Sequence, residues 1–265
     1  MHKSFQHSGY NISYQLFGSG KPIIIFVHGF PEDGTVFENQ YNFLKEKYTV
    51  IVPDLPGSGK SGQNLSLHYI EEFAEIPELI LQNENIEKCF LFGHSMGGYI
   101  ALAFAEKYPE RLLGLGLIHS TAYADSQEKK ENRQRAIELM EKYGGYSFLK
   151  NSVPNLFTKE YVDEHFDVVS ALIEKGKNFD TKTLQQYYQI MKERPDRTEI
   201  LKKINVPVLF IIGEKDTSVL LHDILPQTHL PNISFIKILP NAAHMGILEN
   251  VNEVNITIES MIKTI

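Results

Sequence analysis

The sequence predicts a doubly wound α/β fold with a mostly parallel sheet and an inserted all-helical cap. Short apolar runs recur along the chain and are separated by stretches with helical periodicity. Most of these runs are apolar at every position, which is typical of parallel strands covered by helices on both faces. Between residues 121 and 199 the runs stop and only helical patterns remain. We therefore expect a helical segment inserted between two strands of the sheet.

The strands of the predicted core follow one another along the chain. Residues 3–17 alternate in polarity and predict an antiparallel hairpin at one edge of the sheet. Buried strands are expected at 22–29, 48–54, 88–94, 112–119, 206–213 and 233–239. Helical patterns follow the first three of these strands, as the alternation of a doubly wound fold requires. The core is expected to comprise residues 1–120 and 200–265, and the cap residues 121–199.

The predicted cap contains four helical stretches, at 126–145, 158–177, 180–194 and 196–204. Gly144 is the expected stop of the first stretch. We expect most of the aromatic side chains of the cap to form its own core. The others can line a substrate pocket, and the candidates for substrate contact are Tyr123, Phe148, Phe157 and Tyr187, together with His28 of the core.

Composition excludes several classes of partner. The net charge is −7 and no basic run interleaved with aromatic residues occurs, so nucleic acid or an anionic membrane surface is not an expected partner. The single cysteine, Cys89, excludes an internal disulfide framework and a cysteine-based zinc site. No stretch approaches the roughly 18 apolar residues of a membrane span, and the first residues lack the apolar core of a signal peptide. We expect a cytoplasmic monomer or homodimer that acts on a small molecule and uses no metal or organic cofactor.

The segment "FGHSMGGYIAL" (92–102) places Ser95 between Gly93 and Gly97, where a predicted strand ends and a helix begins. A serine on such a tight turn projects its hydroxyl above the sheet, and small neighbours avoid a collision across the turn. The free N–H groups at the start of the following helix also point toward this position. Ser95 is therefore the predicted nucleophile.

A serine nucleophile needs a base, and the base needs an acid that orients it. On this architecture both should follow the serine, in the order acid and then histidine, in loops after later strands. His244 lies in "LPNAAHMGILEN", after the last predicted strand, and is the predicted base. Asp216 in "GEKD" follows the preceding strand and is the predicted acid, with Asp125 as the alternative. His222 and His229 precede the last strand and fit the base role poorly.

These motifs, together with "VHGFPED" near the start, resemble the α/β-hydrolase superfamily over about residues 20–120 and 200–265. The resemblance implies that the loop after the first buried strand supplies one oxyanion donor, the backbone N–H of Phe30. The residue after the nucleophile, Met96, would supply the second donor. Serine in place of the aspartate of the epoxide hydrolases and haloalkane dehalogenases favours acyl chemistry, and the absence of tryptophan weakens a dehalogenase assignment further.

The sequence therefore predicts an esterase-like serine hydrolase for a small-to-medium, mainly apolar substrate, working through an acyl-enzyme. Alternatives that use the same triad are a C–C bond hydrolase, a lactonase and an acyltransferase. A ligand-binding receptor without turnover on the same fold is a further alternative, since a fold does not by itself define a substrate.

One other motif resembles a functional site. The segment "DLPGSGKSG" (54–62) resembles a phosphate-binding loop. That motif requires glycine five positions before the Gly-Lys-Ser step, and Asp54 stands there instead. Pro53 and Pro56 also interrupt the segment, so we expect a loop with a structural role.

Overall fold

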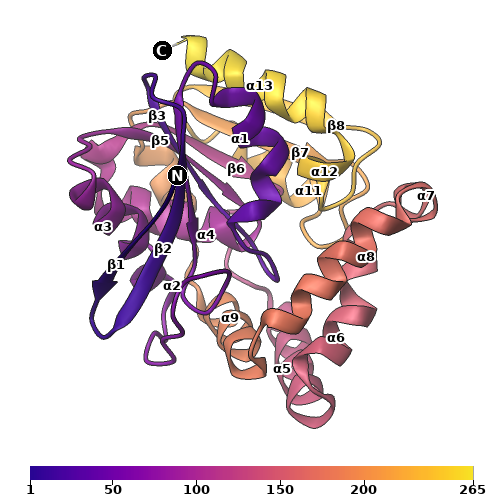
Figure 1. Cartoon of the computed structure of the whole chain (residues 1–265). Helices are drawn as coiled ribbons and strands as arrows, with labels where there is room; N and C mark the ends of the chain where they lie inside the picture. The colour runs from indigo at the N-terminus through magenta and orange to yellow at the C-terminus, as the bar shows by residue number, and fades with distance from the viewer. Residues whose placement is uncertain (265) are drawn as a thin grey trace.

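The apolar runs form the central strands of one eight-stranded sheet in the computed structural model, which describes residues 1–264 (Figure 1). The sheet has the order β1-β2-β4-β3-β5-β6-β7-β8. The strands are β1 (His2–His7), β2 (Tyr10–Phe17), β3 (Ile23–Val27), β4 (Thr49–Asp54), β5 (Cys89–His94), β6 (Leu112–Ile118), β7 (Val208–Gly213) and β8 (Ser234–Leu239). β1 and β2 form an antiparallel hairpin at one edge, β2 pairs antiparallel with β4, and all later pairs are parallel. The predicted fold class is confirmed.

Helices cover both faces of the sheet because successive strand residues point to opposite faces. Ile25 and Val27 of β3 join a core cluster with the helices of one face, whereas Ile24 and Phe26 join a cluster with those of the other. The first face carries α2 (Ile70–Phe73), α3 (Glu75–Asn83), α4 (Met96–Lys107), α10 (Thr198–Lys203) and α11 (Leu221–Ile224). The second carries α1 (Glu38–Leu44), α12 (Gly246–Glu249) and α13 (Val251–Thr264).

The helical stretch before β5 is divided into α2 and α3. In one continuous helix the residue at position 77 would donate its backbone N–H to the carbonyl of Phe73. Pro77 has no N–H, so that hydrogen bond is missing and a new helix begins at Glu75.

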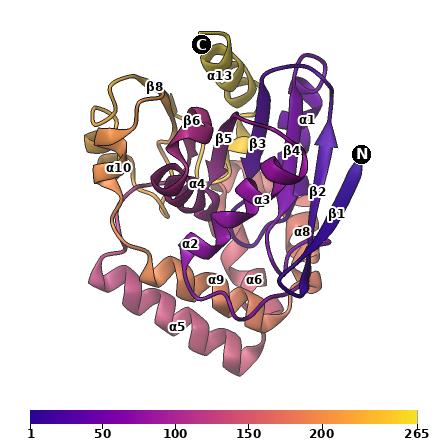
Figure 2. The ribbon, with the colours of Figure 1, turned by 90° about the vertical axis from the view of Figure 1, so that its left-hand side faces the viewer.

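The chain between β6 and β7 contains helices and no strand. Its helices before residue 197 are α5 (Gln127–Tyr143), α6 (Gly145–Ser152), α7 (Lys159–Glu164), α8 (Phe166–Lys175) and α9 (Thr181–Glu193). We call residues 121–196 the helical insert. Figures 1 and 2 show its helices grouped on one side of the sheet, on the side opposite α13.

The observed helices of the insert differ in places from the predicted ones. Gly144 ends α5 as expected, with a φ of 84°, but another helix, α6, begins directly after it. The predicted helix at 158–177 is divided at His165 into α7 and α8. The predicted boundary at residue 199 falls inside α10, a helix that packs against α4 of the core.

Candidate active site

Ser95 lies on the turn between β5 and α4 in a strained backbone conformation, with φ 51° and ψ −117°. A residue with a side chain adopts such angles only where its surroundings enforce them. The backbone N–H of Ser95 donates to the carbonyl of Ile118 at 2.9 Å. Its carbonyl accepts from the N–H of Gly98 at 2.9 Å and from Ser120 Oγ at 2.8 Å. These three bonds hold the turn and leave the Ser95 hydroxyl free for a side-chain partner.

The glycines beside Ser95 are required by close backbone contacts. A Cβ atom at Gly93 would lie 2.1 Å from the carbonyl oxygen of Gly97, across the turn. A Cβ atom at Gly97 would lie 2.0 Å from the carbonyl oxygen of Val27 at the end of β3. Both distances are far below a van der Waals contact, so the turn tolerates no side chain at either position.

The structure brings the three predicted catalytic residues together in one hydrogen-bonded chain. Ser95 Oγ lies 2.8 Å from His244 Nε2, and His244 Nδ1 lies 2.8 Å from Asp216 Oδ2. The residues come from the loops after β5, β8 and β7, which all end at the same edge of the sheet. Ser95 is 9 % exposed and His244 4 %, so the hydroxyl and the imidazole are shielded from bulk water.

The surroundings of Asp216 favour its ionised form. Its Oδ1 accepts the backbone N–H groups of Ser218 at 2.8 Å and Val219 at 3.0 Å. Burial alone would raise the pKa of Asp216, but His244 and His119 hold this pKa well below its ordinary value. An ionised Asp216 accepts a hydrogen bond from the Nδ1–H of His244, so the lone pair of Nε2 is directed at Ser95 Oγ.

The backbone of His244 is held at both of its polar groups. Its N–H donates at 2.9 Å to the carbonyl of Leu156, a residue of the helical insert, and the N–H of Met245 donates to the same oxygen at 3.2 Å. Its carbonyl accepts from His94 Nε2 at 3.0 Å. The Glu249 carboxylate adds a second link, because it accepts backbone N–H groups from both Ala243 and Thr158. We call the segment between β8 and α12, which carries His244, the histidine loop. These hydrogen bonds hold it to the helical insert and to β5.

The two predicted oxyanion donors lie beside Ser95. Gly29, the residue before Phe30, passes so close that an added Cβ atom would lie 2.9 Å from Ser95 Cβ. Met96 is the first residue of α4, where a backbone N–H has no acceptor within the helix. In the described part of the chain, neither Phe30 nor Met96 donates its backbone N–H in a hydrogen bond. Two free donors next to a nucleophile can bind an oxyanion.

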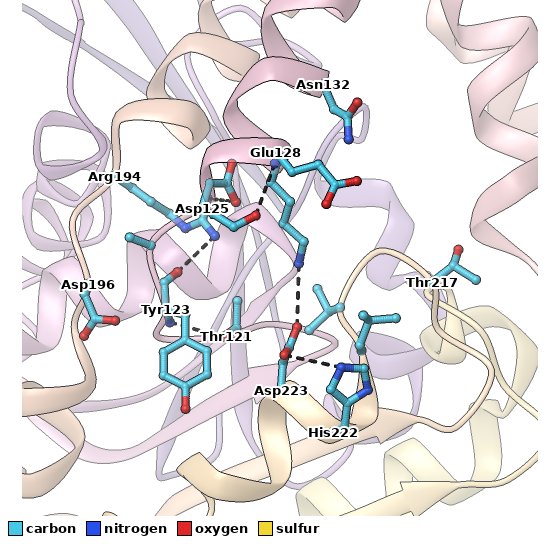
Figure 3. A pocket seen from close by; sticks show the side chains of 15 residues that line it. Thr121, Tyr123, Asp125, Glu128, Asn132, Arg194, Asp196, Thr217, His222 and Asp223 are labelled. Carbon is cyan, nitrogen blue, oxygen red and sulfur yellow. Dashed lines mark hydrogen bonds and ion pairs between the residues drawn. The ribbon is translucent and has the colours of Figure 1, made fainter.

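Two of the predicted substrate-contact residues line surface cavities. Tyr123 lines a cavity of about 620 Å³ between the loops after β6 and β7 and the start of α5 (Figure 3). Val219, whose N–H binds Asp216, lines the same cavity. Ser95, Asp216 and His244 themselves are not among its lining residues. Phe148 lines a separate groove of about 510 Å³ on α5 and α6. Its ring also packs edge-on against Tyr188, and Tyr188 packs edge-on against Phe30.

The other predicted substrate-contact residues are buried. Tyr187 is fully buried and donates its hydroxyl to the carbonyl of Pro56 at 2.9 Å. Phe157 is 6 % exposed and stacks on Tyr161 within the helical insert. His28 is fully buried, and its Nε2 is engaged by Ser58 and by the N–H of Leu55. These three side chains therefore have packing roles in the structure, and their contact with a substrate stays a prediction.

Asp125, the alternative acid, is paired with arginines instead of a histidine. Arg133 Nε donates to its Oδ2. Arg194, drawn beside Asp125 in Figure 3, has its Nη1 2.8 Å from Asp125 Oδ1. Burial would raise the pKa of Asp125, but these two guanidinium groups lower it below its ordinary value. The Arg194 guanidinium also lies over the Tyr99 ring, 3.8 Å from its centroid. Asp125 thus links the start of the helical insert to its end, and Arg194 packs against Tyr99 of the core.

The glycine-rich loop after β4 surrounds the carboxylate of Asp54, the last residue of that strand. The Asp54 carboxylate accepts the backbone N–H of Lys60 at 2.9 Å and that of Gly34 at 3.0 Å. A Cβ atom at Gly59 would lie 2.3 Å from Asp54 Cγ. The carboxylate therefore occupies the place that a phosphate would need, which agrees with the structural role expected for this loop.

The sequence prediction did not assign roles to three buried groups around the triad. These are Glu32, His94 and His119, all at most 1 % exposed. His119 Nδ1 lies 3.5 Å from Asp216 Oδ2, and burial lowers the pKa of His119 to about 4. Glu32 and His94 stand inside the quoted motifs "VHGFPED" and "FGHSMGG", so their position in the sequence was the available signal. Their contact with each other could not be deduced from that signal.

Two other features are absent from the described residues. Among residues 1–264, no group of three or more histidine, cysteine, aspartate or glutamate side chains has the arrangement of a metal site. Across the same residues, no helix combines the length and apolar character needed to cross a membrane.

Comparison with known proteins shows the family of this chain. The sequence model of the alpha/beta hydrolase fold family matches residues 22–251, and the chain belongs to this family. Lipase 3 of Moraxella sp. is 27 % identical over 245 residues, which cover 83 % of this chain and 75 % of the lipase. A thermophilic esterase from Thermogutta terrifontis, solved with malate bound, is 27 % identical with a TM-score of 0.92 over 100 % of this chain and 98 % of the esterase. An esterase from Exiguobacterium antarcticum shares the fold, with 23 % identity, a TM-score of 0.91 and coverage of 99 % and 100 %.

Proposed function

We propose that this protein is a serine hydrolase that cleaves an ester-type bond through an acyl-enzyme. The observation that carries the proposal is the hydrogen-bonded chain from Ser95 Oγ through His244 to Asp216, with 2.8 Å at each step. The lipase and esterase names of the similar proteins support the choice of an ester.

In the first half of the proposed reaction, Ser95 Oγ attacks the ester carbonyl carbon while His244 Nε2 takes the hydroxyl proton. The carbonyl oxygen becomes an oxyanion, which the N–H groups of Phe30 and Met96 bind. When the intermediate collapses, His244 gives its proton to the departing alkoxide, so an alcohol leaves and Ser95 carries the acyl group. In the second half, His244 takes a proton from water, the resulting hydroxide equivalent attacks the acyl carbon, and Ser95 regains the proton as the acid departs.

The preorganised groups account for the expected rate gain. Each oxyanion donor can contribute on the order of 3 kcal/mol, because it points at the developing charge before the reaction begins. The ionised Asp216 stabilises the imidazolium that His244 forms in the transition state. The low exposure of Ser95 and His244 strengthens both effects, since little water screens the charges.

We further propose that residues 121–199 act as a cap over the site. Its contacts with the histidine loop through Leu156 and Glu249 support this role. The cavity of about 620 Å³ beside the Asp216 loop is large enough for a small-to-medium ligand. Its wall combines Val219 and Leu220 with acidic side chains, including Glu128 and Asp223. We therefore expect a polar end of the substrate in this cavity and the apolar part elsewhere.

Steady-state hydrolysis of p-nitrophenyl esters from acetyl to dodecanoyl tests the proposal. We expect repeated turnover with one preferred chain length, and loss of that turnover in Ser95→Ala. Ser260→Ala is a matched control, because Ser260 is an exposed residue of α13 and its loss should leave the rate unchanged. Turnover that survives in Ser95→Ala would overturn the assignment of the nucleophile. Product analysis with an added alcohol or thiol would reveal acyl transfer in place of hydrolysis.

A further inference from the structure

Glu32 and His94 form a buried pair beside the triad that the proposed mechanism does not use. Glu32 lies in the loop after β3, two residues beyond Phe30, and His94 is the last residue of β5, directly before Ser95. Both side chains are completely buried. Placing two ionisable groups in the interior is costly unless each finds suitable partners.

Each polar contact of this pair leads to a different part of the candidate site. His94 Nδ1 lies 3.0 Å from Glu32 Oε1 and 3.1 Å from Oε2. Glu32 Oε2 also accepts the backbone N–H of Gly29 at 2.8 Å, next to the oxyanion donor Phe30. On the other side of the ring, His94 Nε2 lies 3.0 Å from the carbonyl oxygen of His244.

The chemistry of these partners defines the protons on the His94 ring. The His244 carbonyl can only accept, so Nε2 of His94 must carry a proton. The Glu32 carboxylate accepts the N–H of Gly29 and faces Nδ1 with both of its oxygens, as an ionised carboxylate does. Nδ1 must then carry a proton as well, and the ring is an imidazolium cation.

The charged and titratable groups around His94 favour this cation. Glu32 faces it from the loop after β3, Asp216 from the loop after β7, and the rings of His119 and His244 pack against it. Burial would lower the pKa of His94, but the Glu32 carboxylate and the His244 carbonyl raise it above its ordinary value. Burial would likewise raise the pKa of Glu32, but His94 and the Gly29 N–H lower it.

We propose that His94 is a permanently protonated positioning residue. Together with Glu32 it holds in place the loop after β3, which carries Phe30, and the loop after β8, which carries His244. The inference rests on the proposed function for its effect on the rate, but not for the charge itself. Replacing a buried ion pair by apolar residues is often neutral for stability, so stability alone does not explain this pair. Three contacts define the role of the pair: Glu32 to the Gly29 N–H, Glu32 to His94, and His94 to the His244 carbonyl. Together they fix the positions of Phe30 and His244 relative to Ser95, which directly follows His94.

The charge is tested on the wild-type protein without any substrate. Protein labelled with ¹⁵N-histidine is examined by NMR for the protonation of each ring nitrogen, and His94→Asn identifies the His94 signals by their loss. We expect both ring nitrogens of His94 to stay protonated from pH 5 to pH 9. An unprotonated ring nitrogen on His94 at pH 7 would overturn the proposal, whether or not the protein hydrolyses esters.

The positioning role is tested with Glu32→Gln. Glutamine keeps the shape and can still bond both Gly29 and His94, but it removes the negative charge that holds the ring as a cation. We expect one ring nitrogen of His94 to lose its proton at neutral pH. We also expect kcat to fall by about 10- to 100-fold with KM within about twofold, because small displacements of catalytic groups are costly while the substrate does not touch Glu32.

Glu78→Gln is the matched control for this variant. Glu78 is 4 % exposed and forms a bidentate pair with Arg111, before the amino end of β6 and thus away from Ser95. The control should lose stability through its broken ion pair yet keep the wild-type kcat. Glu32→Gln with an unchanged kcat would overturn the positioning role, and so would an equal loss of kcat in both variants. Absence of ester turnover in the wild-type protein would instead count against the proposed function, with the NMR result still deciding the charge.

Discussion

Contacts at the carboxyl edge of the sheet were easier to predict from the sequence than contacts in the helical insert. At the sheet edge, Ser95, Asp216 and His244 meet within hydrogen-bonding distance, although 149 residues separate the first from the last. In the helical insert, four aromatic residues were predicted to contact a substrate: Tyr123 and Phe148 line cavities, whereas Phe157 and Tyr187 are buried. The end of a parallel strand defines where the next residue lies, whereas a helical pattern does not define which neighbour its apolar side will meet.

Substitutions at the carboxyl edge of the sheet should change the rate of the chemical step. The largest effect is expected for His244→Gln. Without the imidazole, Ser95 has no base, and kcat should fall by roughly a million-fold, as in other triads. Measurement of kcat with the best p-nitrophenyl ester checks this value. His229→Gln is the control, because His229 is exposed and should leave kcat unchanged. A loss of less than tenfold in His244→Gln would remove the distinction between the two regions.

Substitutions of buried residues in the helical insert should change stability instead. Tyr187→Ala removes a fully buried ring that packs edge-on against Phe73, and we expect unfolding free energy to fall by about 3–5 kcal/mol. Urea denaturation measures this loss, and the folded variant should keep its KM. Tyr143→Ala, at a ring that is 58 % exposed, should change stability by less than about 0.5 kcal/mol. A large rise in KM for Tyr187→Ala without loss of stability would show that Tyr187 contacts the substrate after all.

His119 offers a test at the sheet edge that depends on pH. In the folded protein the pKa of His119 is about 4, whereas in the unfolded chain it is near 6.5. Between these two values the unfolded state binds the proton and the folded state does not, so stability falls as the pH is lowered from 6.5 to 4. The contribution of His119 to this loss is about 3 kcal/mol.

The variant His119→Asn should lack this component of the pH dependence. Asparagine tolerates the left-handed backbone at this position, where φ is 48°. Urea denaturation of both proteins at several pH values between 4 and 7 gives the difference in unfolding free energy between them. Groups other than His119 titrate in both proteins, so their contributions cancel in this difference. Identical pH slopes in the two proteins would show that His119 titrates normally in the folded state.

The smallest effect is expected for Tyr123→Ala, at the border between the two regions. Tyr123 lines the cavity beside the Asp216 loop, so its loss should raise KM by about fivefold, equivalent to about 1 kcal/mol. Stability and kcat should change little. KM values for ester substrates of different acid and alcohol parts measure the effect. An unchanged KM for every ester would place the substrate outside this cavity.

Much of the fold and of the candidate site was predictable because it depends on local rules. The apolar runs marked the parallel strands, and the glycines beside Ser95 marked a turn without space for side chains. Pairings between distant segments were not predictable in the same way. Glu32 and His94 meet because the loop after β3 packs against the end of β5. Tyr187 is buried because α9 presents that side of the helix to the core. No residue type or spacing in the sequence encodes these contacts.

The most direct test of the central claim is the covalent labelling of Ser95 by a fluorophosphonate. Such a reagent reacts with a serine that is activated by a base and leaves a stable adduct. Intact mass and peptide mapping should show one adduct per wild-type chain, located on Ser95, and none on folded Ser95→Ala. A folded wild-type protein that remains unlabelled, or an adduct on another residue, would contradict the account.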